Sequence, residues 1–153
     1  MAAPTRARLL NTATTFITNF NKESPEAVIE IRSPSCIHEI KPDSFAMTGK
    51  YTNDEYLTMW RESILAALPK GIQLTVDDRE PVIDEQTRKV VLYVKSRAES
   101  VAGVYENTYV WNLTVSEDGT MIDHILEFVD SKTATDFTQK IMAAIQQTQQ
   151  GNP

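Results

Sequence analysis

The chain has 153 residues, of which 41% are hydrophobic and 24% are charged, a composition typical of one soluble globular domain over residues 1–153. A formal net charge of −6 and a pI near 4.9 argue against nucleic-acid binding, which requires a basic surface. The single cysteine, Cys36, excludes an intrachain disulfide and fits a reducing compartment such as the cytoplasm. No apolar run approaches the length of a membrane span, so we expect no membrane partner.

The first 21 residues admit two interpretations. They contain Arg6, Arg8 and several threonines but no acid, which resembles a transit peptide. The same segment also places apolar residues on one face of a helix, namely Leu9, Leu10, Ala13, Phe16, Ile17 and Phe20. This periodicity favours a folded first helix over about residues 4–20.

Shorter elements follow. Ser24 precedes Pro25, which predicts a helix start and a short helix to about residue 31. A short strand over residues 36–40 carries His38. Thr52 and Glu55 form a capping box that opens a helix to residue 68. The apolar stripe of that helix contains Tyr56, Trp60, Ile64 and Leu68.

Four strands are predicted over residues 72–83, 89–99, 104–115 and 121–129. A last helix begins near residue 131, and we expect the glutamine-rich end, 146–153, to be frayed. This order predicts an α+β fold in which a curved antiparallel sheet wraps around helices. Such a layout leaves a conical, mostly apolar pocket for a small molecule.

Strict alternation of side chains in the third predicted strand indicates one inward and one wet face. The inward face carries Tyr105, Asn107, Tyr109, Trp111, Leu113 and Val115. Residues 116–120 suit a turn closed by a left-handed Gly119. A three-residue loop centred on Asp118 places Tyr109 across from Glu127, Trp111 across from Ile125 and Leu113 across from Asp123. In this register His124 faces outward.

Glu127 and His38 are the candidate catalytic residues. A carboxylate on a buried strand face is costly unless partnered, and desolvation raises its pKa towards the range of a general acid or base. The alternative is a carboxylate held by a tyrosine or an arginine for structural reasons. The imidazole of His38 can transfer a proton near pH 7, or can simply be satisfied by a backbone carbonyl.

The candidate substrate-binding residues are aromatic or polar side chains of the expected pocket. Tyr105 and Tyr109 can polarise a substrate carbonyl from either side of Asn107. Trp60 and Trp111 are suited to line an apolar wall. All four aromatic residues can also be ordinary core residues. Two histidines far apart in sequence are a poor basis for a metal site, so we expect none.

Three segments carry a resemblance to a known family. Residues 105–111 read Tyr-Glu-Asn-Thr-Tyr-Val-Trp, residues 125–131 read Ile-Leu-Glu-Phe-Val-Asp-Ser, and residues 34–38 read Pro-Ser-Cys-Ile-His. Together with the order of elements, they resemble the SnoaL-like branch of the nuclear-transport-factor-2-like superfamily. More narrowly, the chain is similar to small fungal isomerases and cyclases of meroterpenoid and indole-alkaloid pathways.

The resemblance implies an enzyme without a cofactor, often a homodimer, that moves protons on a polycyclic substrate. It assigns acid–base roles to His38 and Glu127, and hydrogen-bonding roles to Tyr105 and Tyr109. The leading hypothesis is an isomerase or cyclase of a fungal meroterpenoid that directs a ring rearrangement or a lactone migration.

Several alternatives remain open. They are a semipinacol-type isomerase of an indole alkaloid, a non-catalytic module that binds an apolar ligand or partner, and a dehydratase. A dehydratase of this superfamily resembles a two-histidine site, which His38 and the outward His124 do not form. An epoxide hydrolase would require an Asp/Arg/Asp cluster that the inward positions do not supply.

The last predicted strand also indicates an assembly. Its even positions, Ile122, His124, Leu126 and Phe128, are nearly as apolar as its odd ones. A strand that is apolar on both faces is expected to be covered on both. We therefore expect a homodimer formed back to back through the sheets.

Overall fold

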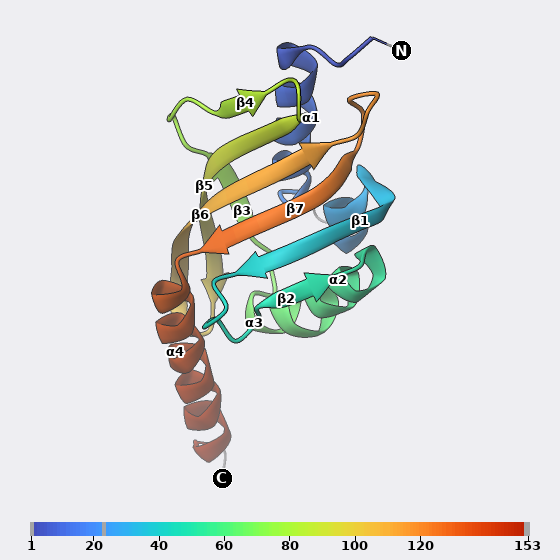
Figure 1. The fold of residues 1–153 in the computed structure, drawn as a ribbon. Coiled ribbons are helices and arrows are strands. Elements are labelled where there is room, and N and C mark those ends of the chain that lie inside the picture. Colours follow the sequence, from blue (N-terminus) through green and yellow to red (C-terminus); the bar gives the residue numbers. More distant parts are fainter. Residues whose placement is uncertain (1, 23, 152–153) are drawn as a thin grey trace.

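The computed structural model describes residues 2–22 and 24–151, and shows a curved sheet with helices packed behind it (Figure 1). The strands follow the order β2-β1-β7-β6-β5-β3, and β4 pairs with β5 outside this path. Their bounds are β1 Arg32–Lys41, β2 Gly49–Tyr51, β3 Gln73–Val76, β4 Val82–Asp84, β5 Lys89–Ser100, β6 Gly103–Val115 and β7 Ile122–Val129. The predicted α+β class is confirmed.

The sheet is mixed, which corrects the expectation of a wholly antiparallel one. β1 runs parallel to β7 and places His38 beside Ile125, whereas the other neighbouring strands pair antiparallel. Strand pairing between segments so distant in sequence leaves no local signal, because turn chemistry reports only on neighbouring strands. The parallel pair matters because it brings β1, with His38, against the strand that carries Glu127.

The helices before β3 lie behind the sheet, whereas the last helix follows β7 and extends beyond the end of the sheet (Figure 1). The helical segments are α1 Arg6–Asn19, the 3₁₀ turn η1 Pro25–Ile29, α2 Asn53–Met59, the π-helical turn η2 Trp60–Ile64, α3 Leu65–Ala67 and α4 Ser131–Gln150. The hydroxyl of Thr5 caps α1, whose apolar stripe is buried against the sheet. This confirms the prediction of a folded first helix.

Several predicted boundaries differ from the structure, and one strand was not predicted. The expected strand over 72–83 is two strands, because the charged segment 77–81 contains Pro81 and the carboxylate of Asp77 accepts from the N–H of Arg79 at 3.0 Å. The strand around His38 begins earlier, at residue 32, and β2 was not predicted. Residues 146–150 continue α4 rather than fraying, whereas the expected frayed residues 152 and 153 lie outside the described residues.

The hairpin between β6 and β7 confirms the predicted inward face but corrects the predicted pairs. Glu127 lies opposite Trp111, and Tyr109 lies opposite Val129, so the register differs by two residues from the expected one. Because a shift by two preserves the alternation of side chains, Glu127 still faces inward with Tyr109.

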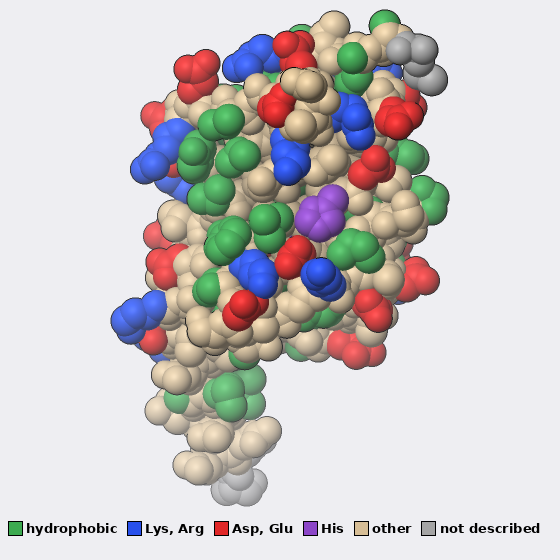
Figure 2. All heavy atoms as spheres, viewed as in Figure 1, with side chains coloured by type: hydrophobic (Ala, Val, Ile, Leu, Met, Phe, Trp, Pro, Cys, Tyr) green, Lys and Arg blue, Asp and Glu red, His purple; other side chains and the backbone are tan. Residues whose placement is uncertain are grey.

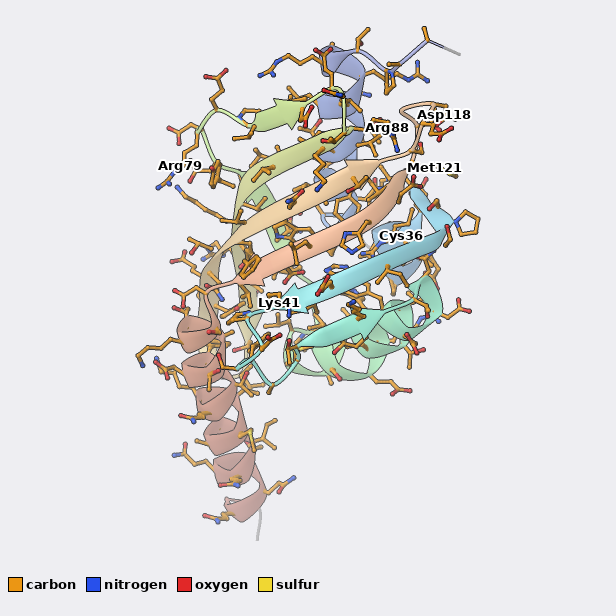
Figure 3. All side chains as sticks on the ribbon, viewed as in Figure 1. Cys36, Lys41, Arg79, Arg88, Asp118 and Met121 are labelled. Atoms are coloured by element: carbon orange, nitrogen blue, oxygen red, sulfur yellow. The ribbon has the colours of Figure 1, made fainter. Side chains whose placement is uncertain are left out.

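A longer loop and a bulge cause this displacement. The N–H of Ser116 donates to the carbonyl of Met121, which lies in the loop labelled in Figure 3. Next, Asp123 forms a bulge that interrupts the ladder and reverses the alternation of side chains. Ile122 is therefore buried rather than outward, and Asp123 does not face Leu113 as predicted.

The turn before β7 contains a glycine that tolerates no side chain. Gly119 has a φ of +78°, and a Cβ there would lie 2.7 Å from Cβ of Pro4 and 2.9 Å from Cδ of Arg8. We expect Gly119→Ala to lower the free energy of unfolding by about 2–3 kcal/mol, from backbone strain plus the steric conflict with the N-terminal segment. Urea denaturation measures this loss.

Gly71 is the matched control. Its φ is +74°, and nothing lies within 4 Å of a Cβ built there. Gly71→Ala should therefore cost only about 1 kcal/mol of backbone strain. Equal losses in the two variants would contradict close packing of the Gly119 turn on the N-terminal segment.

Candidate active site

A cavity of about 260 Å³ lies between the concave face of the sheet and the helices. The sheet side of its wall contains Ile40, Leu74, Tyr105, Tyr109, Trp111, Glu127 and Val129. The helical side includes Phe20, Tyr56, Trp60, Ile64, Phe137 and Ile141. Most of these side chains are apolar, which suits a compact hydrophobic molecule.

Glu127 supplies the ionisable carboxyl of this wall. It belongs to β7, and only 8% of the residue is exposed. Burial raises the pKa of Glu127 from 4.5 to about 8, and the positive charge of Arg32 opposes this rise. The carboxyl is therefore mainly protonated at neutral pH, so it can donate a proton to a molecule in the cavity.

His38 lies behind Glu127 rather than on the cavity wall. Its Nε2 is 2.9 Å from Oε1 of Glu127, and the imidazole is fully buried. The ring stacks on Tyr56 with centroids 4.2 Å apart. Burial, together with the nearby Arg32, holds the pKa of His38 well below its usual range. The imidazole is neutral at neutral pH, and it contacts the carboxyl rather than the cavity.

Arg32 extends the contact between His38 and Glu127 into a buried chain of three hydrogen-bonded side chains. No pattern in the sequence singled it out. Its Nη1 lies 3.0 Å from Nδ1 of His38, and its Nε donates to the carbonyl of Val28 at 2.9 Å. The guanidinium also lies over the rings of Tyr56 and Phe16, at 4.3 and 5.2 Å from their centroids. These aromatic faces and acceptors hold a cation that is only 4% exposed.

The order Arg32, His38, Glu127 fixes the direction of the hydrogen bonds. A guanidinium has donors and no acceptor, so Nδ1 of His38 must accept from Arg32. The proton of the neutral imidazole is then on Nε2, which donates to Oε1 of Glu127. This leaves Oε2 of Glu127 as the oxygen that can carry the acidic proton.

A second set of polar side chains surrounds the tyrosines of β6. The hydroxyl oxygens of Tyr109 and Ser96 are 3.0 Å apart, and Nδ2 of Asn107 donates to the hydroxyl of Tyr105 at 2.6 Å. Burial raises the pKa of both tyrosines. Both phenols line the cavity, whereas Asn107 lies behind Tyr105 and is not part of the wall.

The remaining candidates fall into two groups. Trp60 and Trp111 line the cavity as expected, with Trp60 on the π-helical turn. His124 lies on the outer face, as predicted, and its Nε2 is 3.7 Å from the carboxylate of Glu39. Cys36 is buried, and burial raises the pKa of its thiol to about 11, which leaves it unreactive. Within residues 2–22 and 24–151, no group of three or more His, Cys, Asp or Glu side chains could hold a metal ion.

Sequence reasoning missed two neighbours of His38. Tyr56 stood in the apolar stripe of its helix, and its stacking on the imidazole could not be read from that stripe. Arg32 precedes Ser33 and Pro34, where a helix was expected to end, so its inward orientation had no periodic signal. In the structure β1 carries an irregularity between residues 32 and 37, which accompanies the burial of Arg32.

No protein-family model matches the sequence. The chain is 37% identical over 142 residues to austinoid biosynthesis clusters protein H of Penicillium brasilianum, with 92% of this chain and 95% of that protein covered. Among solved structures, it resembles the BvnE pinacolase of Penicillium brevicompactum, with a TM-score of 0.84, 29% identity and coverage of 92% and 98%.

It also resembles AusH of Aspergillus nidulans, with a TM-score of 0.77, 37% identity, and coverage of 84% of this chain and 87% of that one. The similarity to these relatives runs through nearly the whole chain, including the strands that carry Glu127 and His38. The chain belongs to the family of small SnoaL-like fungal proteins that includes the austinoid biosynthesis cluster proteins.

Proposed function

We propose that the protein is an isomerase that rearranges an oxygenated polycyclic secondary metabolite, most specifically a fungal meroterpenoid, by acid–base catalysis. The observation that carries this proposal is a carboxyl with a pKa of about 8 at the wall of an apolar cavity. The austinoid cluster relatives support the substrate class, and the resemblance to a pinacolase supports a skeletal shift as the reaction.

Glu127 acts first as a general acid. The proton on Oε2 passes to an oxygen or nitrogen of the substrate, which makes an adjacent carbon electron-poor and allows a neighbouring bond to migrate to it. The carboxylate then takes a proton from another position of the rearranged molecule. One proton is given and one is recovered, so that the product is an isomer of the substrate.

His38 and Arg32 stabilise the transient carboxylate. The Nε2–H of His38 donates to Oε1, and the positive charge of Arg32 lowers the pKa of Glu127. His38 is therefore a positioning residue in this proposal, rather than a second acid or base in contact with the substrate. The apolar walls, with Trp60 and Trp111, hold one conformer of the substrate and exclude water.

The direct test is to incubate the purified protein, with no cofactor added, with oxygenated intermediates made by the enzymes that neighbouring biosynthetic genes encode. The expected result is a product of unchanged mass and altered carbon skeleton. A requirement for a nicotinamide or a metal ion would contradict the proposal.

The non-catalytic binding module makes the opposite prediction. It would bind these intermediates without converting them, and Glu127→Gln would leave its biological role intact. An indole-alkaloid substrate is the alternative within the isomerase proposal, because a 1,2-shift of the semipinacol type, without loss of water, can act on either skeleton. Parallel incubation with intermediates of both classes distinguishes the two.

We further propose a homodimer, formed through the outer face of the sheet. Phe128 is 45% exposed and pairs across the strands with Val110, which is 38% exposed. Hydrophobic side chains lie between charged ones over β5, β6 and β7 on the face seen in Figure 2. Because Phe128 is already more than half buried, burial of its remaining surface contributes roughly 1 kcal/mol per copy. The buried Ile122 does not contribute to this face, contrary to its predicted orientation.

Sedimentation at micromolar concentration tests the assembly. We expect a species of twice the chain mass, and a single chain of 17.2 kDa in Phe128→Asp. Val101→Asp is the matched control, because Val101 is 68% exposed in the tight turn that joins β5 to β6. A wild-type monomer, or equal dissociation in both variants, would contradict dimerisation through Phe128.

A further inference from the structure

Both donors of the Asn107 side chain are used within the protein. Oδ1 of Asn107 accepts from the backbone N–H of Thr108 at 2.8 Å, which fixes the orientation of the amide. Nδ2 donates to the carbonyl of Asp130 at 3.0 Å and to the hydroxyl of Tyr105 at 2.6 Å. Because Asn107 is only 5% exposed and outside the cavity wall, it has nothing left to offer a substrate.

The bond from Asn107 determines what Tyr105 can do. Since the Tyr105 oxygen accepts from an amide that cannot reverse, the proton of that phenol must be donated elsewhere. Among the hydrogen bonds of residues 2–22 and 24–151, none takes this proton: the Tyr105 hydroxyl is bonded to Asn107 alone, whereas the Tyr109 hydroxyl is bonded to Ser96 at 3.0 Å. Burial raises the pKa of Tyr105, and the hydrogen bond with Asn107 opposes this rise.

The direction of these bonds therefore points from the amide towards the cavity. Because the Tyr105 oxygen accepts from Asn107 and Tyr105 lines the cavity, its phenol proton remains for a molecule bound there. The ring of Phe137 packs on Tyr105 with centroids 4.8 Å apart and adds an apolar surface beside this donor.

We propose that Asn107 is a positioning residue that sets Tyr105 as a hydrogen-bond donor to an acceptor oxygen of the substrate, a ketone, ester or ether oxygen. This inference deepens the proposed function, because it specifies a group that the substrate carries away from Glu127. The inference concerns a hydrogen bond to the bound substrate, and its test does not depend on proton transfer by Glu127.

Camphor and bornane are suitable probes, because they share one compact bicyclic skeleton and differ by a ketone oxygen. A carbonyl that accepts a hydrogen bond absorbs infrared light at lower wavenumber. We expect the carbonyl band of bound camphor to shift to lower wavenumber in the wild type, and Tyr105→Phe to reduce this shift. We also expect camphor to bind severalfold more tightly than bornane.

Asn107→Asp reverses the direction of the hydrogen bond between residue 107 and Tyr105 while conserving the shape of the side chain. The introduced carboxylate accepts the proton of Tyr105, so the phenol turns its lone pairs towards the ketone. The ratio of bornane to camphor dissociation constants should fall about tenfold, the value of one hydrogen bond, and the infrared shift should disappear. Asn107→Leu, which only removes the amide donor, should weaken the shift and raise the pKa of Tyr105 in an alkaline absorbance titration.

Thr108→Val is the matched control on the next residue, whose side chain is exposed on the outer face. Thr108→Val should leave unchanged both the ratio of bornane to camphor dissociation constants and the carbonyl band of bound camphor. An unchanged camphor band in both Asn107 variants, or equal affinity of the wild type for camphor and bornane, overturns the proposal. Because neither probe is converted, an inactive or misassigned Glu127 does not affect these outcomes.

Discussion

Glu127→Gln is expected to lower kcat by about 10²–10⁴-fold, the usual contribution of a positioned general acid. Glutamine keeps an oxygen that accepts from Nε2 of His38, and it fills the same volume in the wall, but it has no acidic proton. Steady-state kinetics on the converted intermediate measure the loss. Glu106→Gln is the control, because Glu106 is exposed on β6 and pairs with Arg97. An equal loss in both variants would contradict the assignment of Glu127.

The pH profile provides an independent test of the same assignment. If the protonated form of Glu127 is required, kcat/KM is full well below pH 8 and declines as the pH rises through about 8, the pKa of the free enzyme. An activity that instead increases through about pH 8 would show that the carboxylate, acting as a base, starts the reaction.

The raised pKa of Glu127 also makes the stability of the folded protein depend on pH. The folded state holds the Glu127 proton to about pH 8, whereas the unfolded chain releases it near 4.5, so the free energy of unfolding falls as the pH rises between these values. Glu127→Gln removes this dependence. The inactive variant should therefore have a higher Tm than the wild type near pH 7, which separates lost chemistry from lost folding.

Arg32→Met should both destabilise the protein and change its pH profile. The substitution leaves the carbonyl of Val28 and Nδ1 of His38 without their donor, at about 2–3 kcal/mol in the free energy of unfolding. It also removes the positive charge that lowers the pKa of Glu127. The decline of kcat/KM should therefore move above pH 8, with a lower maximum because the transient carboxylate loses its cation.

Arg61→Met is the matched control for Arg32. Arg61 is a half-exposed residue of the π-helical turn that forms an ion pair with Glu26. Its replacement should change the free energy of unfolding by no more than about 0.5 kcal/mol, since exposed ion pairs contribute little. A pH profile unchanged in Arg32→Met would show that Glu127 titrates independently of the cation.

The inward face of β6 was predictable because alternation of side chains is a local property of a strand. Tyr105, Tyr109 and Trp111 could thus be placed on the cavity wall without knowledge of the correct register. The pairing of Glu127 was wrong by two residues, because the length of a loop and the presence of a bulge depend on packing. The loop and the bulge each shifted the register by one residue in the same direction, and a total shift of two residues leaves Glu127 on the predicted face.

The buried chain behind Glu127 was only partly predictable. His38 could be proposed from its residue type and its strand, but its contact with Glu127 depends on the parallel pairing of β1 with β7. Arg32 was beyond prediction, because an arginine in a sequence indicates solvent exposure unless its partners are known. Its partners here are a backbone carbonyl, an imidazole and two aromatic rings, which come from four separate segments.

The two sides of the cavity wall have consequences for the divergence of this family. The proton-transfer groups are anchored in the sheet and the buried chain behind it, whereas Ile64, Ala67, Phe137 and Ile141 come from the helices. Substitutions at these helical positions can reshape the space for a carbon skeleton without moving Glu127. Gene duplication followed by change in the helices is therefore an accessible evolutionary route to new substrates, and one cluster could recruit several copies for successive steps.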